Sequence, residues 1–492
     1  MTLITNHVRL YCSKRVRFSF GSLKSFPNTG PTPLPFIGNL HTMLWHEPGY
    51  SAFEMWRRKY GPVYTYWLEW QYFRKHSSDW CYVLVDLTLY FSLVMLVDPH
   101  LKKYQNISGP FPFVMISDYP TLKETFVKDG DAYAGKFHLE EITKLYRGTR
   151  LRKSVLYGGA YGILDTSGDL WRDHRRFALH VLKDFGLGSD GMEQRDVFDI
   201  AVGSVTNQLL FGYRFDEEHI GEFRELKSMI SRQMRESAQP AVGLLMVYPW
   251  LGHLPYFNDI LKTIISYRDA FYSFFDNQIE EHKKNINFDL AESNDYVEAY
   301  LKEQKKREAD GDDSFSHIQL QNVCLDLWIA GMETTSNTLS WGAVYLLNNP
   351  NVQEIQRMAN LLPMNLPHEL IRDVHIGEWH IPAKTGVVAQ ISNVLYDEKV
   401  FHNPFTFDPS RFIDDNGKLK KVDELIPFSI GKRQCLGEGL ARMELFLFIA
   451  NLFNRFETLS GDVSNSINLS SFTYSSHVWT QKLRRVQRKP LV

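Results

Sequence analysis

The sequence predicts a predominantly helical protein with a minor β-sheet (α+β), folded as one large domain. Stretches with helical periodicity follow one another from residue 165 onward. The longest, 318–347, is apolar on several faces and nearly free of charge in its middle, as expected of a buried central helix. Strand-like alternation is confined to short segments such as 62–67 and 386–392, so the sheet has to be small.

The elements are predicted in the following order along the chain. Residues 50–60 form an amphipathic pattern typical of a helix, and residues 62–67 alternate like a strand. The charged stretch 302–313 is expected to be an exposed linker that breaks the helical pattern. Further helices are predicted over 120–129, 170–182, 197–211, 220–237, 257–284, 318–347 and 437–451, and further strands over 111–117 and 386–392.

Composition allows a large core and argues against a nucleic-acid partner. Hydrophobic residues make up 44% of the 492 residues, and 55 basic against 57 acidic side chains give a formal charge of −2. This balance supplies no bulk attraction to nucleic acid. Four scattered cysteines without a Cys-x-x-Cys pair fit a reducing or cytosol-facing environment better than a disulfide framework. They are Cys12, Cys81, Cys324 and Cys435.

The beginning of the chain is basic and then rich in proline. Residues 1–26 contain five basic and no acidic side chains, and no apolar run long enough to span a bilayer. This composition fits a mitochondrial presequence, a basic segment on a membrane surface or a disordered tail, and the residues leave all three open. Residues 27–43 are interpreted as a proline-rich hinge, and residues 44–492 as the globular domain.

One cysteine follows a glycine-containing turn and precedes a helix. The stretch is Phe428-Ser-Ile-Gly431-Lys-Arg433-Gln-Cys435-Leu-Gly437. Free N–H groups and the dipole at a helix N-terminus are expected to lower the pKa of Cys435 toward the thiolate. No second cysteine or histidine stands at zinc-ligand spacing, so a lone thiolate favours an axial ligand to haem iron. A buried structural cysteine is the alternative for Cys435 taken alone.

The neighbours of this cysteine have chemical reasons to be there. Gly431 permits a tight turn, Gly437 lets a flat macrocycle approach the backbone, and Arg433 can pair with a haem propionate. The string resembles the F-x-x-G-x-R-x-C-x-G haem-binding loop of the cytochrome P450 superfamily, the haem-thiolate monooxygenases, of the animal microsomal type. Phe428 completes the match. The resemblance implies haem b (iron-protoporphyrin IX) between the long central helix and the helix that follows Cys435.

A second motif lies on the predicted central helix, Ala330-Gly331-Met-Glu333-Thr334-Thr335. Glycine inside a helix costs ~1 kcal/mol relative to alanine, and an acid in an apolar helix must be hydrogen-bonded or used. A threonine bonded to its own helix beside a solvated glutamate would explain the Thr-Thr pair alone. The string resembles the family's A-G-x-D/E-T-T. The resemblance implies that Glu333 and Thr334 deliver protons during dioxygen activation and that Gly331 leaves room for oxygen.

Two weaker motifs agree with this family. Trp171 and Arg175 fit W-x-x-x-R, whose spacing puts both side chains on one helix face, where family members hold a haem propionate. Glu354 and Arg357 fit E-x-x-R, with Arg411 as the third member. A Glu–Arg pair three residues apart is by itself usually a surface helix pair. The resemblance implies that these three residues instead have a structural role and lock the cysteine loop.

The resemblance implies a monooxygenase that inserts one oxygen atom from O₂ into a small lipophilic substrate, such as a xenobiotic, fatty acid or steroid. An NADPH-dependent flavoprotein reductase would supply the electrons. The alternatives are a reductase-independent haem-thiolate isomerase or peroxygenase, and a non-functional product of an imperfect gene model. Retention of Glu333 beside Thr334 favours the monooxygenase. The family also implies the cytosolic face of the endoplasmic reticulum membrane, although no membrane anchor is evident in the sequence.

The chain departs from the family pattern at three internal places. About forty residues separate the strands 62–67 and 111–117, where the family has an immediate hairpin. We interpret 70–108 as an aberrant insertion. Its apolar run 81–97 is short for a membrane span. No room is left for a family helix at residues 195 and 196, nor for a helix and loop at 353 and 354, and missing helices are expected to expose apolar faces.

Overall fold

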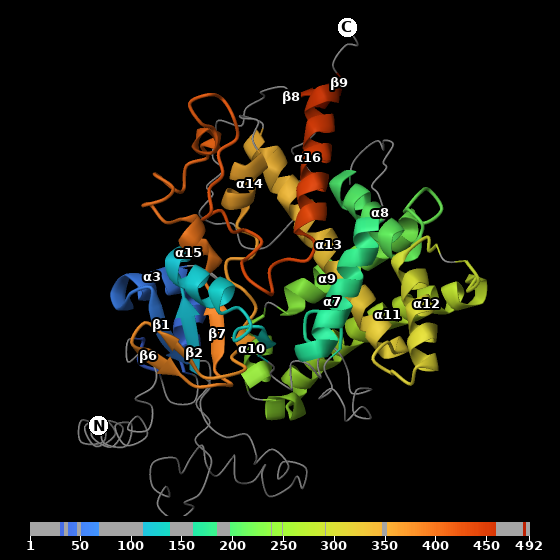
Figure 1. Cartoon of the computed structure of the whole chain (residues 1–492), viewed down its shortest axis with the longest axis horizontal. Helices are drawn as coiled ribbons and strands as arrows, with labels where there is room; N and C mark the ends of the chain where they lie inside the picture. Colours follow the sequence, from blue (N-terminus) through green and yellow to red (C-terminus); the bar gives the residue numbers. More distant parts are fainter. Residues whose placement is uncertain are drawn as a thin grey trace, which may run out of the picture.

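The computed structural model describes residues 30–33, 38–46, 51–67, 112–137, 161–184, 197–237, 239–247, 249–290, 292–346, 352–458 and 486–488. Within these ranges the protein is mainly helical with small sheets, which confirms the predicted fold class. Figure 1 shows the largest sheet on the left and most of the long helices on the right. The predicted basic segment 1–26, the insertion 70–108 and the junction at 195 and 196 lie outside the described residues.

The largest sheet contains five short strands in the order β1-β2-β7-β4-β3. Strands β1 (Val63–Trp67) and β2 (Pro112–Ile116) pair antiparallel, with Trp67 opposite Pro112, so the expected pairing of these strands is confirmed. Strand β7 (Gly386–Ala389) runs parallel to β2. Nearly all residues of these three strands are buried, as in sheets covered on both faces. The other strands are β3 (Gly135–Lys136), β4 (His368–Glu369), β5 (Val374–Ile376), β6 (Trp379–Ile381), β8 (Phe456–Thr458) and β9 (Val486–Arg488).

An aromatic cluster fixes the N-terminal helices on this sheet. Helix α2 (Leu40–Trp45) precedes α3 (Ser51–Tyr60), whose Phe53 and Trp56 are almost fully buried against Tyr66 of β1. The rings of Trp56 and Tyr66 stack with centroids 6.2 Å apart. The predicted amphipathic helix and the strand after it are therefore both present and in contact.

Helix α13 (His317–Leu346) is the central helix, as predicted, and its Cys324, Trp328 and Met332 are fully buried. Helices α8 (Val197–Phe211) and α16 (Glu438–Arg455) pack against it (Figure 1). The remaining helical elements are α5 (Tyr119–Leu122), the π-helical turn η2 (Lys123–Lys128), α7 (Gly168–Asp184), α9 (Ile220–Ser237), α10 (Pro240–Val247), η5 (Pro249–His253), α11 (Pro255–Asn285), α12 (Tyr296–Ala309), α14 (Val352–Ala359), α15 (Ile391–Leu395) and η6 (Pro409–Phe412).

The linker predicted over 302–313 is wrong for most of its length, because α12 continues to Ala309. Asp295 caps the helix by accepting a hydrogen bond from the backbone N–H of Glu298 at 2.8 Å. Glu298 also pairs with Lys302 at 2.7 Å, four residues later, while Tyr300 is fully buried. The charges therefore form ion pairs along one helix face and do not break the helix.

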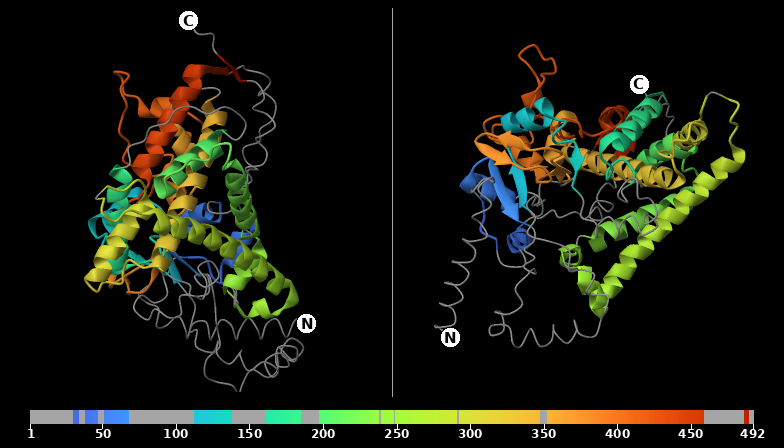
Figure 2. Two further views of the ribbon diagram at one scale, coloured as in Figure 1. Left: turned by 90° about the vertical axis from the view of Figure 1, so that its right-hand side faces the viewer. Right: turned by 60° about the horizontal axis from the view of Figure 1, so that its bottom comes forward.

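Helix α11 is the longest helix among the described residues, and its yellow-green ribbon runs diagonally along one side of the molecule in Figure 2. It begins at Pro255, where the missing backbone N–H of proline is tolerated.

Across the described part of the chain, no helix is both long enough and apolar enough to span a bilayer.

Candidate active site

The cysteine loop approaches η2 closely. Gly431 has φ +88°, and a Cβ built on it would lie 2.1 Å from the carbonyl oxygen of Phe126. Only glycine fits such a contact without displacing the backbone. The backbone N–H of Cys435 donates to the carbonyl of Phe428 at 3.0 Å, and α16 begins at Glu438. The predicted tight turn before a helix is thus confirmed.

The thiol of Cys435 is accessible but surrounded by protein. The residue is exposed, yet burial raises the pKa of the thiol above its ordinary value. The backbone N–H groups of Gly437 and Glu438 act in the opposite direction and do not overcome this effect. The predicted lowering of the Cys435 pKa is therefore wrong for the polypeptide alone, since desolvation outweighs the helix N-terminus. A bound metal cation would reverse this balance.

Two arginines and a tryptophan meet beside the cysteine loop. The guanidinium carbon of Arg433 lies 3.9 Å from the ring centroid of Trp171, and that of Arg175 lies 5.8 Å from it. Arg175 Nη2 also donates to the carbonyl of Gln434 at 2.7 Å. The motif of Trp171 and Arg175 lies far from the cysteine loop in the sequence. The fold brings the two into contact at Gln434, the residue before Cys435.

The charge of Arg433 is poorly compensated. Its Nε donates to the carbonyl of Ala134 at 2.9 Å, and further donors reach Ile163 and Thr166, again at backbone carbonyls. Burial, and then the charge of Arg175, lowers the pKa of Arg433 to about 9. Among the described residues neither arginine forms an ion pair with a carboxylate.

Sequence reasoning missed two further members of this cluster, Lys136 and His368. They are directly opposite each other in the β3–β4 pair. Burial lowers the pKa of Lys136 to about 8; the charge of Asp165 opposes this effect and the charge of Arg433 adds to it. Burial also lowers the pKa of His368 to about 3, with Lys136 and Arg433 acting in the same direction. Neither residue belongs to a motif, and only strand register reveals their proximity.

The three basic side chains of this group, Lys136, Arg175 and Arg433, fit the two propionates of haem, whereas the low pKa of His368 keeps that imidazole neutral beside them. Buried positive groups without partner carboxylates are costly, and bound anions would satisfy them through charge-assisted hydrogen bonds. A Cβ built on Gly437 meets nothing within 4 Å, so open space adjoins the backbone where a macrocycle is expected to approach. Among the described residues no three His, Cys, Asp or Glu side chains gather to hold a metal, so Cys435 belongs to no multi-residue metal site there.

Thr334 is bonded to its own helix. Its Oγ1 donates to the carbonyl of Ala330 at 2.6 Å, which is the back-bonding arrangement left open by the sequence. Ala330 is exposed although Trp328 and Met332, its neighbours on α13, are buried. The hydroxyl of Thr334 and the carbonyl of Ala330 therefore meet at an accessible place on a helix whose other described side chains are buried or half-buried.

Glu333 is held by other side chains and is not simply solvated. Its Oε1 accepts from Nζ of Lys227 at 3.0 Å and its Oε2 from Nδ2 of Asn337 at 3.1 Å. Lys227 also pairs with Asp199 at 3.3 Å. One amine on α9 therefore connects acids on α8 and α13.

The space left by Gly331 is used for helix packing. A Cβ built there would lie 3.0 Å from Oγ1 and 3.3 Å from Cγ2 of Thr206 on α8. The expectation that this gap leaves room for oxygen is therefore not what the structure shows. The absent side chain allows α8 and α13 to approach each other closely.

Comparison with known proteins identifies the family. A family model described as Cytochrome P450 matches residues 188–354 and 352–477, more than half of the chain. This chain belongs to the cytochrome P450 family. Cytochrome P450 2C4 of Oryctolagus cuniculus is 29% identical over 487 residues, 88% of each chain. Cytochrome P450 2H1 of Gallus gallus is 29% identical, covering 87% of this chain and 86% of the relative. Cytochrome P450 2M1 of Oncorhynchus mykiss is 27% identical, covering 89% and 88%.

Membership makes this P450 a haem-dependent monooxygenase, an oxidoreductase with haem b as cofactor and O₂ as co-substrate. The mainly helical fold with a minor sheet agrees with the family. The matches extend through α13, α14 and the Cys435 loop, which carry three of the four sequence motifs.

In this P450 the arginines of the fourth motif, Arg357 and Arg411, donate hydrogen bonds to backbone carbonyls. Arg357 is fully buried and donates to Leu395 at 3.0 Å and to Pro404 at 2.7 Å. Arg411 donates to the carbonyl of Thr406 at 3.2 Å, which Arg357 also reaches at 3.4 Å. The structure therefore brings Arg357 and Arg411 to one carbonyl. The side chain of Glu354 lies outside the described residues.

Proposed function

We propose that this P450 inserts one oxygen atom into a small lipophilic molecule, with electrons from an NADPH-dependent flavoprotein reductase. The observation that carries the proposal is the cationic cluster around Trp171, directly joined to the Cys435 loop. A xenobiotic, a fatty acid and a steroid all belong to the proposed substrate class. Leu362 and Leu366, each 57% exposed between α14 and β4, support an apolar ligand.

Haem b supplies the oxygen-activating chemistry once it is bound. We assign Cys435 as the residue whose thiolate would hold the haem iron. Arg433 and Arg175 are assigned to its propionates, and the desolvation of both guanidinium groups supports that assignment. Lys136 completes the proposed anion-binding group. Trp171 orients the arginines through its ring face.

We assign proton handling to Thr334 and Glu333. A hydroxyl has one donor and two acceptor positions, and Thr334 places its donor on Ala330. Its oxygen therefore keeps the capacity to accept a proton or a water hydrogen bond. Glu333 lies next to it in sequence and is connected through Lys227 to Asp199, which is one-third exposed. This arrangement supports a path for protons from the surface of α8.

We propose a structural role for Arg357 and Arg411, together with Glu354. Their hydrogen bonds hold the segment from Leu395 to Thr406 in one conformation. For localisation we propose the cytosolic face of the endoplasmic reticulum membrane, supported by the resemblance of residues 27–43 to the proline-rich hinge of microsomal members.

The thiolate assignment is tested by the spectrum of the ferrous–CO complex. The purified, haem-loaded chain should show the red-shifted Soret band of thiolate ligation, and Cys435→Ala should lose it. Cys324→Ala is the matched control, because Cys324 is fully buried in α13 and should leave the band in place. A wild-type protein without this band would refute the assignment.

The reductase proposal is tested by the source of electrons. Product formation should require NADPH and the flavoprotein reductase, and Thr334→Ala should increase peroxide release per O₂ consumed. Turnover that runs on added peroxide and is unchanged by the reductase would instead support the peroxygenase alternative.

A further inference from the structure

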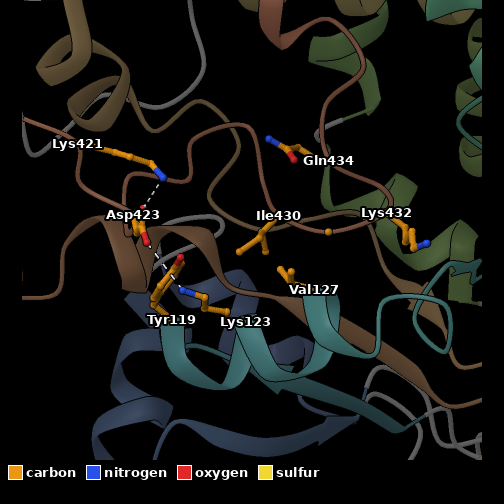
Figure 3. Close-up of a pocket in the computed structure, with 9 residues that line it drawn as sticks. Tyr119, Lys123, Val127, Lys421, Asp423, Ile430, Lys432 and Gln434 are labelled. Atoms are coloured by element: carbon orange, nitrogen blue, oxygen red, sulfur yellow. Dashed lines mark ion pairs between the residues drawn. The ribbon is translucent and has the colours of Figure 1, made fainter.

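A hollow lies beside the cysteine loop, and none of its lining residues is among those assigned to haem. Its volume is about 520 Å³, and it is lined by one segment from the first third of the chain and by two segments within residues 421–434 (Figure 3). They are the α5–η2 segment, residues 421–423 and the loop residues 430–434. The lining residues are Tyr119, Lys123, Val127, Lys421, Asp423, Ile430, Gly431, Lys432 and Gln434.

The residues that line this pocket include more amines than carboxylates. Asp423 pairs with Lys421 at 3.0 Å and, through its other oxygen, with Lys123 at 3.8 Å. Among the lining residues two amines therefore share one carboxylate, while Glu424, which does not line the pocket, adds negative charge near Tyr119. Lys432 turns away from this group in Figure 3 and pairs with Asp131 at 3.2 Å.

An apolar surface lies next to these amines. Val127 is 45% exposed, and Ile430 from the cysteine loop faces it in Figure 3. The ring of Tyr119 lies under the amine of Lys123 at 5.6 Å. An exposed valine beside two amines that share one carboxylate favours a ligand with one negative group and an apolar body.

We propose that this pocket binds a small amphipathic monocarboxylate. The carboxylate lies between Lys123 and Lys421, and the apolar part covers Val127 and Ile430. The volume falls within the ~300–1,000 Å³ that is typical of small-molecule sites. The ligand competes with Asp423 for both amines, because the same donors serve either carboxylate.

Binding at this place connects η2 to the loop that carries Cys435. Gly431 already touches Phe126 through its backbone, and Gln434 precedes the cysteine directly. A ligand that contacts Val127 on one side and Ile430 on the other holds these segments together. It therefore stabilises the folded protein, as any ligand that binds only the native state does.

The probe is 4-phenylbutyrate, titrated by calorimetry into the haem-loaded full chain, with 4-phenylbutyramide as its uncharged control. Lys421→Gln and Lys123→Gln should each weaken phenylbutyrate binding about tenfold, the effect of losing one charge-assisted hydrogen bond. Lys420→Gln is the matched control, because Lys420 is exposed, adjacent in sequence and outside the pocket. Asp423→Asn should strengthen binding, since it removes the competing carboxylate.

Two readouts separate this pocket from the haem site. Binding should raise the unfolding temperature without shifting the ferric Soret band, and neither readout requires turnover. Equal affinity for the amide, equal weakening by Lys420→Gln, or weaker binding by Asp423→Asn would overturn the proposal. A Soret shift that survives Lys421→Gln would place the ligand at the haem and overturn it as well.

Discussion

Burial sets the protonation of several side chains close to the proposed haem site. It raises the pKa of the Cys435 thiol and lowers the pKa of Arg433 to about 9. Both effects oppose the charged forms that the chemistry needs, so the charged forms depend on a bound partner of opposite sign. Neither shift is visible in the sequence, because desolvation depends on what the fold places around a side chain.

The effect of burial on protonation can also be tested at Glu444, which is not part of the cysteine loop. It is 4% exposed on α16, its Oε1 has no hydrogen-bond partner, and burial raises its pKa to about 8, opposed by a hydrogen bond from Thr335. The folded protein therefore holds this proton more tightly than the unfolded chain. The resulting stabilisation is complete below the ordinary carboxyl pKa and is lost as pH rises toward 8.

Glu444→Gln should therefore stabilise the protein at neutral pH. The free energy of unfolding is about 3 kcal/mol lower at pH 7 than at acid pH, because the folded protein must either keep Glu444 protonated or bury its charge. Unfolding temperatures measured between pH 5 and pH 8 should fall less steeply for the variant than for the wild type. Parallel curves for the two proteins would show that Glu444 is not protonated in the folded state.

Most elements were predictable from local patterns. The helices 197–211 and 220–237 have the predicted limits, because apolar periodicity and end signals lie within each segment. Helix α12 was missed because its C-terminal half is charged and was interpreted as a linker. The buried Tyr300, which holds the helix in the core, lies just before that charged stretch. The contact between the cysteine loop and η2 was also unpredictable, since it joins elements that are separate in sequence.

Gly431→Ala should disrupt this contact. The substitution forces a side chain into the carbonyl of Phe126 and leaves alanine at φ +88°, which together should cost about 2 kcal/mol or more. We expect a lower unfolding temperature and a smaller fraction of thiolate-ligated ferrous–CO complex. Gly439→Ala is the control, because a Cβ there meets nothing within 4 Å and alanine favours the helix. Equal behaviour of the two variants would contradict the tight-turn assignment.

At the scale of the whole molecule, the strands on either side of residues 68–111 pair with each other in one sheet. Trp67 and Pro112 are direct partners in the β1–β2 pair, so the chain ends flanking residues 68–111 lie side by side. The sheet then continues from β2 to β7, whose residues come from the last third of the chain. Strands β1 and β2 are therefore paired antiparallel, as in a hairpin, at one edge of the described sheet.

Deletion of residues 70–108 should preserve the fold. It leaves a five-residue connection from 68 to 69 and 109 to 111, within the usual length of hairpin loops (~2–5 residues). The shorter loop should stabilise the β1–β2 pair by about 2 kcal/mol through a smaller loss of chain entropy. The variant should keep the ferrous–CO spectrum and unfold at an equal or higher temperature. Loss of folding would show that the deleted segment belongs to the domain.

The sequence by itself determined the fold class, most helices and the family. Four short motifs carry fixed residue types, and local periodicity carries the helices, so both can be recognised without contacts. Only the tertiary structure showed that Lys136 and His368 join Arg433 and that Thr206 fills the space beside Gly331. It also showed that desolvation outweighs the helix N-terminus at Cys435. These features depend on which distant segments pack together, and that information lies in three-dimensional contacts.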